Sequence, residues 1–287
     1  MSTLQNKVDF AAIITVKNAN PNGDPLNGNR PRENYDGHGE ISDVCIKRKL
    51  RNRFQDMGET IFVQSDDRAE DGLKSLSQRA QENIKEKLSR EDYAKKACEI
   101  WFDVRTFGQV FAFKAGKKDG DKDNESVSVG VRGPVSVHQA VSVSPIEIRS
   151  MQITKSVNSE PGDKKSSDTM GMKHSIEFGA YVIYGSINVQ LAEKTGFSEQ
   201  DAEIVKEALR SLFENDSSSA RPDGSTEVNK VFWWKHNNKT GQYSSAKVHR
   251  SLIVKQKNEG EKPNSFDCFT YEIMPLENLE VETLEGL

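Results

Sequence analysis

The alternation of apolar and polar positions is clearest near the start of the chain, between Val8 and Lys17. Successive side chains of a β-strand point to opposite sides of a sheet, so residues two apart share a face. The apolar face of this segment consists of Val8, Phe10, Ala12, Ile14 and Val16. We therefore predict a central strand here.

A loop and then a helix are predicted after this strand. Residues 18–39 contain three prolines and several glycines, which neither a helix nor a long strand tolerates. Ser42 is suited to the N-cap of a helix, Asp43 to its first turn and Gly58 to its end. The apolar positions at helical spacing are Ile46, Leu50, Phe54 and Met57. The pattern predicts a helix with one buried side.

Further helices and strands are predicted beyond residue 60. Apolar positions at helical spacing predict a helix over 69–97, broken near 89–92, and another that starts at Ser198. Strand-like patterns are found at 60–63, 126–148, 176–191, 231–234, 248–254 and 266–273. Residues 114–125 and 154–175 are polar and lack periodicity, so we expect insertions there.

The order of these elements predicts the fold class. Two helices follow two long strands on a largely antiparallel sheet, which is typical of an α+β, ferredoxin-like (RRM-like) fold. The polar insertions are expected to project from this core. The length of 287 residues is compatible with a single domain over 1–287, which is our expectation.

Composition changes this picture in three respects. The net charge of −4 argues mildly against a general nucleic-acid coat, which is usually basic overall. The three cysteines are far apart and odd in number, which favours the reducing cytoplasm. No apolar run is long enough for a transmembrane helix, so we expect no membrane partner.

Positive charge is concentrated on the first predicted helix. With Ile46 and Leu50 facing the core, the side chains expected to point outwards are those of Lys47, Arg48 and Arg51. Neighbouring cations repel one another, and a bound polyanion would neutralise them. The alternative is a solvated helix face that pairs with acidic residues elsewhere in the chain.

The loop before this helix presents Asn18, Asn20 and Asn22 beside the cations. Asparagine both donates and accepts hydrogen bonds, and Gly23 and Gly28 allow a ligand to approach the backbone closely. Such a loop suits the recognition of phosphate and sugar groups. A turn-rich connector without a ligand is the alternative.

The insertion at 154–175 combines basic and apolar residues. The residues of interest are Lys155, Lys164, Lys165, Met170, Met172 and Lys173. Apolar side chains at the tip of a basic hairpin can wedge between stacked bases. The alternative is a disordered loop. The aromatic run at 232–234 is more typical of a core than of a base-stacking platform.

The sequence carries no motif that predicts an enzyme. A phosphate-binding loop, a dinucleotide-binding glycine motif, a serine-nucleophile motif and a zinc-protease motif are all missing. The histidines are scattered, and we expect neither a metal nor a cofactor. A metal-independent ribonuclease that uses His38 or His174 as a general acid or base is kept as the alternative.

Four segments in order resemble the backbone subunit of CRISPR Cascade complexes. They are NANPNGD at 18–24, ISDVCIKRKLRNRF at 41–54, DVRTFGQVF at 103–111 and GPVSVHQAVSVSPI at 133–146. The sequence is most similar to the subtype I-C, Csd-type form of this subunit, which belongs to the RAMP superfamily. The resemblance runs over residues 8–190.

The resemblance implies a palm of RRM-like fold, a finger-like insertion at 58–125 and a thumb at 150–176. Copies of such a subunit polymerise as a helical filament along the spacer of a guide RNA, whose bases pair with target DNA in antiviral defence. Other Cascade subunits, including an RNA-processing and a large subunit, are implied partners. Because a different subunit cuts the precursor RNA, no catalytic set is implied here.

The resemblance and the residue types together give a set of expected RNA-binding residues. They are Asn18, Asn20, Asn22, Lys47, Arg48, Arg51, Arg132, Gln139, Lys155, Lys164, Lys165, Met170, Met172 and Lys173. One feature does not fit an RNA-coating filament, because residues 272–287 hold five glutamates and no basic residue. We expect these acids to contact a basic patch on the neighbouring copy.

Overall fold

The computed structural model describes residues 2–69, 71–86, 88–112, 128–155, 157 and 170–287. Strand β1 (Val8–Ala19) lies at its centre and pairs antiparallel with β10 (Met170–Ile187) and with β11 (Thr226–Lys235). Its first nine residues are all buried, whichever face they point to. The prediction of a central strand is therefore confirmed.

The main sheet has the strand order β14-β11-β1-β10-β8-β4, and β7 and β9 also pair with β10. The strands not yet bounded are β4 (His38–Ile41), β7 (Val135–Val137), β8 (Ala140–Pro145), β9 (Ile148–Thr154) and β14 (Glu282–Glu285). Along the chain, the core elements follow as β1, α1 (Asp43–Asp56), β8, β10, α6 (Glu199–Arg210) and β11. This βαββαβ order, with the strands arranged β11-β1-β10-β8, is the ferredoxin-like topology. The predicted α+β, RRM-like fold class is confirmed.

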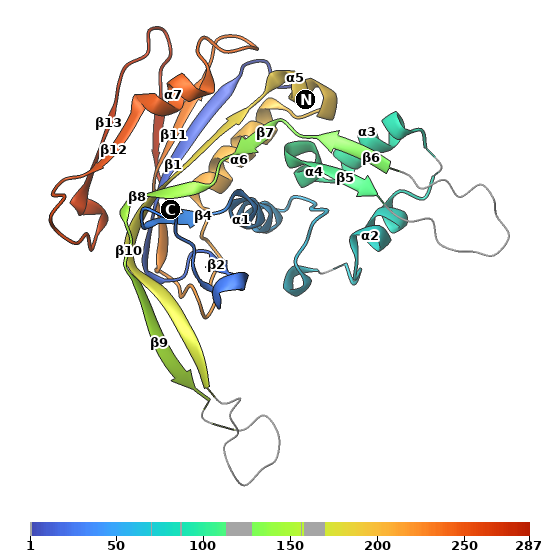
Figure 1. The fold of residues 1–287 in the computed structure, drawn as a ribbon. Coiled ribbons are helices and arrows are strands. Elements are labelled where there is room, and N and C mark those ends of the chain that lie inside the picture. Colours follow the sequence, from blue (N-terminus) through green and yellow to red (C-terminus); the bar gives the residue numbers. More distant parts are fainter. Residues whose placement is uncertain (1, 70, 87, 113–127, 156, 158–169) are drawn as a thin grey trace.

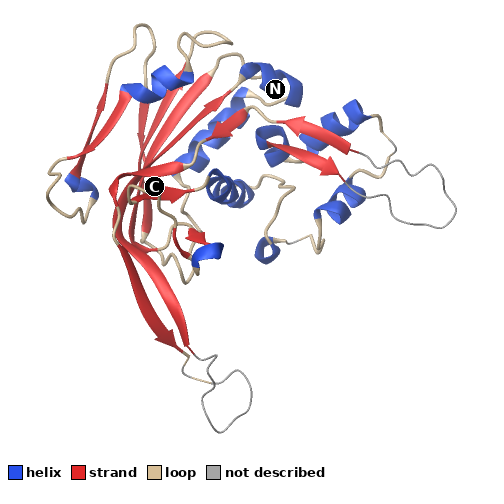
Figure 2. Ribbon diagram, in the orientation of Figure 1, coloured by secondary structure: helices blue, strands red, loops and turns tan. Residues whose placement is uncertain are grey.

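Helices α1 and α6 cover one face of this sheet (Figures 1 and 2). Ile46, Leu50 and Phe54 of α1 are buried in this core, as their spacing predicted. Ser42 caps α1 by accepting a hydrogen bond from the Cys45 amide. Ser198 starts α6 with a full capping box, also as predicted.

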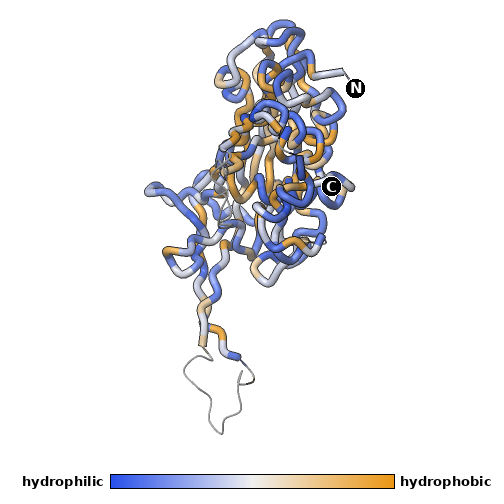
Figure 3. Tube along the Cα trace, turned by 90° about the vertical axis from the view of Figure 1, so that its right-hand side faces the viewer, coloured by the Kyte–Doolittle hydropathy of each residue, from blue (hydrophilic) through white to orange (hydrophobic). Residues whose placement is uncertain are grey.

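The other face is covered by α7 (Ser245–Ser251) and by a hairpin of β12 (Leu252–Gln256) and β13 (Phe269–Ile273). Phe232, Trp233 and Trp234 of β11 are all buried, Trp233 on the α1 side and the other two under this hairpin. The aromatic run is therefore core, as expected. Figure 3 shows the apolar segments gathered in the body of the molecule.

A second apolar cluster lies beside α1, away from the sheet (Figure 1). Its elements are α2 (Leu76–Asn83), α3 (Arg90–Ile100), α4 (Phe102–Phe107), β5 (Gly108–Ala112) and β6 (Ser128–Arg132). Phe62, Trp101 and Phe111 pack against one another at its centre. Helix α5 (Val189–Thr195) follows β10 and packs near α3 and α4.

Several element predictions are wrong. Residues 60–63 are not a strand, because the Phe62 and Val63 amides donate to the Asp103 carboxylate and not to a neighbouring strand. The predicted helix over 69–97 is broken into α2 and α3 as expected, but α2 begins only at Leu76 and the break lies at 84–89 and not at 89–92. The predicted strand over 248–254 begins as α7, which Ser244 caps. The loop at 18–39 includes the short strands β2 (Gly23–Asp24) and β3 (Arg30–Pro31).

Candidate nucleic-acid interface

A two-stranded hairpin of β9 and the first residues of β10 projects from the sheet (Figure 1). In its register Met172 lies opposite Gln152, and Lys173 lies opposite Met151. Cross-strand partners share a face, so Met170 and Met172 lie on one face while Met151 and Ile153 lie on the other. All four are exposed, by 62%, 55%, 61% and 47% respectively. The hairpin is therefore apolar on both faces.

Only two of the four exposed apolar residues of this hairpin were identified from the sequence. Met170 and Met172 were expected to be exposed apolar residues, whereas Met151 and Ile153 were assigned no role. The signal was present as an apolar residue at every second position of SMQIT, residues 150–154. Of the predicted lysines, Lys155 and Lys173 lie exposed on the hairpin. Lys164 and Lys165 lie outside the described residues.

The base of the hairpin is tied to the first loop by polar contacts. Arg30 of β3 donates from Nη1 to Ser150 Oγ at 2.9 Å, and His174 Nδ1 lies 2.9 Å from the same oxygen. Ser150 and His174 are cross-strand partners on the face that carries Met172. The loop thus lies against the methionine side of the hairpin. Arg30 was not predicted to be part of the site.

The asparagines of this loop differ in what they do. Asn20 is buried and donates from Nδ2 to the Asn29 carbonyl, and Asn22 Oδ1 accepts from the Ser42 amide at 2.9 Å. These two therefore shape the loop and join it to the start of α1. Asn18 is exposed and has a left-handed backbone (φ 52°), where β1 bends into the loop. It is the one of the three that faces solvent.

The cations of α1 do not form the outward patch that was predicted. Arg51 is only 13% exposed and donates from Nε to the buried Asp103 carboxylate at 2.9 Å. Arg48 donates from Nη1 to the Val63 carbonyl at 2.6 Å, and burial lowers the pKa of its guanidinium. Lys47 pairs with Asp43, one turn away on the same helix. The prediction of outward-pointing side chains is wrong for Arg51 and Arg48, because the segment at 60–63 and α4 pack over this side of α1.

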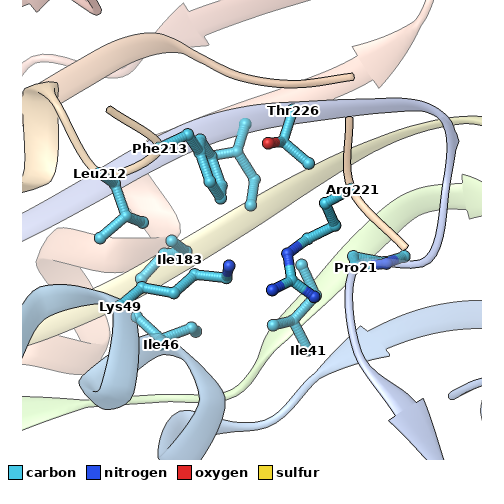
Figure 4. A pocket seen from close by; sticks show the side chains of 10 residues that line it. Pro21, Ile41, Ile46, Lys49, Ile183, Leu212, Phe213, Arg221 and Thr226 are labelled. Atoms are coloured by element: carbon cyan, nitrogen blue, oxygen red, sulfur yellow. The ribbon is translucent and has the colours of Figure 1, made fainter. Parts of the chain in front are cut away.

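Lys49, also on α1, is buried and pairs with Asp216. Arg221 donates from Nε to the same carboxylate oxygen at 3.2 Å. Figure 4 shows Lys49 and Arg221 extending from opposite sides of a small apolar cavity. Burial lowers the pKa of the Lys49 ammonium, and Asp216 opposes that shift. The cavity measures about 10 Å³, room for one water and not for a phosphate group.

The two weaker candidates lie elsewhere. Arg132 is exposed at the end of β6, beside the second apolar cluster. Gln139 is exposed just before β8, donates to Glu40, and borders a groove under β12 on the face of the sheet opposite α1. The structure therefore brings together the first loop and the hairpin. It leaves these two residues apart from them.

The histidines proposed for catalysis have neutral partners in the described part of the chain. His38 Nδ1 lies 2.7 Å from the Ser142 carbonyl, and His174 contacts Ser150. Within the described residues, no group of three or more metal-ligating side chains is present. None of the described helices is both long and apolar enough to span a bilayer.

The acidic C-terminal segment is partly used within the chain. Glu282 pairs with Lys206, and Glu285 pairs with Lys230, so β14 is held at the edge of the sheet by charge as well as by backbone hydrogen bonds. Two of the five glutamates thus have partners within the chain, while the contact of this segment with a neighbouring copy stays a prediction. Burial alone would lower the pKa of Lys206, but its hydrogen bonds to Glu203 and Glu282 raise it, and the hydrogen bond to Glu285 raises the pKa of Lys230.

The fold and this surface define an RRM-like α+β protein from which an exposed apolar hairpin projects. Comparison with known sequences then identifies the family. The chain belongs to the family of CRISPR-associated protein Cas7, which matches residues 6–274.

The chain is also similar to individual proteins and solved structures. The CRISPR-associated protein Cas7 of Haloferax volcanii is 27% identical over 230 residues, which is 76% of this chain and 67% of that protein. Among solved structures, a chain of a CRISPR RNA-guided surveillance complex in a pre-nicking state is 16% identical, with a TM-score of 0.45 and 83% of both chains covered. A chain of another such complex is 19% identical, with a TM-score of 0.43, covering 79% of this chain and 68% of that one.

Proposed function

We propose that this chain is the RNA-binding backbone subunit of a subtype I-C Cascade complex. Several copies bind along the spacer of one CRISPR guide RNA and present its bases to target DNA, for antiviral defence in the cytoplasm. The observation that carries the proposal is the projecting hairpin, which exposes two methionines on one face and a methionine and an isoleucine on the other, in a chain of the Cas7 family. Its base is joined to a loop rich in asparagine and glycine.

In this proposal the hairpin is the thumb, within 150–176, and it crosses the RNA strand. Apolar side chains that enter a stack of bases separate neighbouring bases. Met170 and Met172 would contact the base on one side, and Met151 and Ile153 the base on the other. A hairpin that is apolar on only one face could not make both contacts. The two-faced arrangement therefore supports a wedge more strongly than Met170 or Met172 alone.

The RNA backbone would be held by the polar groups around the wedge. Lys155 and Lys173 flank it, while Arg30 and Asn18 lie in or beside the adjoining loop. The Lys47 side chain is more exposed than that of Arg51, 27% against 13%, and we retain Lys47 as a phosphate contact. We assign Arg48 and Arg51 a supporting role, because their partners, the Val63 carbonyl and the Asp103 carboxylate, lie within the finger-like region at 58–125.

The partners in this proposal are the guide RNA, target DNA through the guide, other copies of this chain in a helical filament, and the RNA-processing and large subunits. The ribonuclease alternative is not favoured, because His38 and His174 contact a carbonyl and a hydroxyl and pair with no carboxylate among the described residues.

The proposal is tested with purified full-length protein and a spacer-length RNA without metal ions. We expect several copies to assemble on each RNA in sedimentation, and CRISPR repeat RNA to remain intact on denaturing gels. A single bound copy on a long spacer, or cleavage of the repeat that His38→Ala or His174→Ala abolishes, would refute it.

A further inference from the structure

A groove runs between β8 and β12 on the face of the sheet opposite α1. It consists of two adjoining hollows of about 480 and 370 Å³, which share Val143 and Val254. Its floor is formed by the side chains of Val141, Val143 and Val182, and one wall by β12. None of the residues predicted to bind RNA lines it except Gln139. The groove is thus separate from the hairpin and loop described above.

The wall of this groove is an unpaired strand edge. The Met274 amide donates to the Ser251 carbonyl and the Lys257 amide to the Cys268 carbonyl, so alternate residues from 251 to 257 bond to β13. In an antiparallel pair, the residues that alternate with these bonded ones direct their backbone amides and carbonyls away from the partner strand. Val254 and Gln256 therefore direct their amides and carbonyls away from β13, and no partner for them exists among the described residues.

The hairpin of β12 and β13 is a second layer that is one strand short. It packs over β1, β10 and β11 (Figure 1). Val141 and Val143 of β8 line the hollow beside its open edge. A strand added beside β12 would pair with the free backbone groups, and its alternate side chains would cover these valines. An open edge next to an apolar floor is a template for such an addition.

The charge around the groove indicates the kind of strand. Arg250 and Lys255 are exposed at its rim, and neither has an ion pair among the described residues. Glu259 is the only carboxylate among the described residues that line it. The apolar floor favours a peptide over a nucleic acid, and the cations favour acidic residues at its ends.

We propose that the β8–β12 groove binds an extended peptide segment of a partner protein, which is apolar at alternate positions, acidic at its flanks and adds as a strand to β12. The groove shares only Gln139 with the residues expected to bind RNA, so this proposal stands or falls independently of the proposed function.

The probe for this test is a fluorescein-labelled octapeptide that alternates valine and threonine and ends in glutamate on both sides. The control probe is the same peptide with alternate backbone nitrogens methylated, which prevents strand pairing. With the full-length protein we expect saturable binding of the first probe by fluorescence anisotropy, and at least tenfold weaker binding of the second. Hydrogen exchange at the Val254 and Gln256 amides should slow when the first probe binds.

Two variants connect this binding to the groove. Val254→Pro removes an edge donor that β13 does not use, and the double change Arg250→Glu with Lys255→Glu reverses the rim charge. Each should lower the affinity for the probe at least tenfold. Lys239→Ala, at a residue outside the groove, should leave this affinity unchanged. Unchanged probe binding in both groove variants would overturn the proposal. Displacement of the probe by RNA would also overturn it, because it would assign the groove to RNA. A change in the oligomeric mass of the RNA-free protein in the groove variants would do so too, because it would assign the groove to a second copy.

Discussion

Arg51 and Asp103 form a buried ion pair 2.9 Å long that joins α1 to the second apolar cluster. The Asp103 carboxylate also accepts hydrogen bonds from the Phe62 and Val63 amides. One side chain of α4 therefore binds both α1 and the segment at 60–63 that follows it. A cation that the sequence suggests for RNA therefore has an intramolecular partner. Its removal is expected to affect folding before it affects binding.

Arg51→Ala is expected to lower the free energy of unfolding by about 3 kcal/mol or more, since it leaves the Asp103 carboxylate buried without its counter-ion. Lys47→Ala on the same helix removes only an exposed pair with Asp43 and should cost about 0.5 kcal/mol or less. Urea denaturation of both variants measures the difference. Equal stability of the two would contradict the role of Arg51 as a support.

Asp9 should contribute a part of the stability that depends on pH. Burial alone would raise the pKa of its carboxyl, but hydrogen bonds that include those from His236 and Lys7 outweigh burial and hold this pKa below its usual value. A depressed pKa in the folded state gives stability that is complete above the unfolded value, about 3.9, and is lost as the pH falls further. The wild type should therefore lose stability below about pH 4 more steeply than Asp9→Asn.

Urea denaturation of both proteins at several pH values from 7 to 3 measures this effect. Asp36→Asn is the matched control, since Asp36 is exposed and has no ion pair among the described residues. Its stability should follow that of the wild type across the range. If the Asp9→Asn and wild-type curves stayed parallel to pH 3, the hydrogen bonds to Asp9 would not favour its ionised form.

Salt dependence distinguishes the cations that contact phosphate from those that support the fold. The affinity for RNA should fall linearly with salt on logarithmic axes, and each lost phosphate contact should reduce that slope by roughly one unit. Lys155→Ala and Lys173→Ala should each show this reduction. Lys239→Ala, which removes an exposed lysine paired with Glu193, should retain the wild-type slope. Wild-type slopes in the hairpin variants would exclude these lysines from the site.

The central part of the fold follows from local patterns, because each face of β1 and the buried side of α1 depend only on residue spacing. The partners of the α1 cations do not follow, since Arg51 meets a residue 52 positions away and Lys49 one 167 positions away. Periodicity gives the direction of a side chain from its helix, but not what packs there. The segment at 60–63 was mistaken for a strand for the same reason, since its amides bond to a distant carboxylate.

The candidate site, too, was predicted from the sequence only in part. The sequence pointed to the loop through its asparagines and glycines, and to two methionines of the hairpin because they are apolar residues within a basic insertion. It did not reveal that β9 pairs with β10 in a register that places Met151 and Ile153 on the opposite face. Nor did it reveal that Asn20 and Asn22 hydrogen-bond within the loop.

The central claim is that the hairpin separates bases of a guide RNA at regular intervals. The direct measurement places 2-aminopurine, whose fluorescence rises when it is unstacked, at each position of a spacer-length RNA in turn. We expect bright positions at a constant interval with the wild type, and their loss with the double variant Met151→Ser and Met172→Ser, which changes one exposed residue on each face. Met274→Ser, at an exposed residue that follows β13 and lies outside the hairpin and the first loop, is the control and should retain the pattern. A uniform signal along the RNA with the wild type, or a periodic signal that survives in the hairpin variant, would contradict the account.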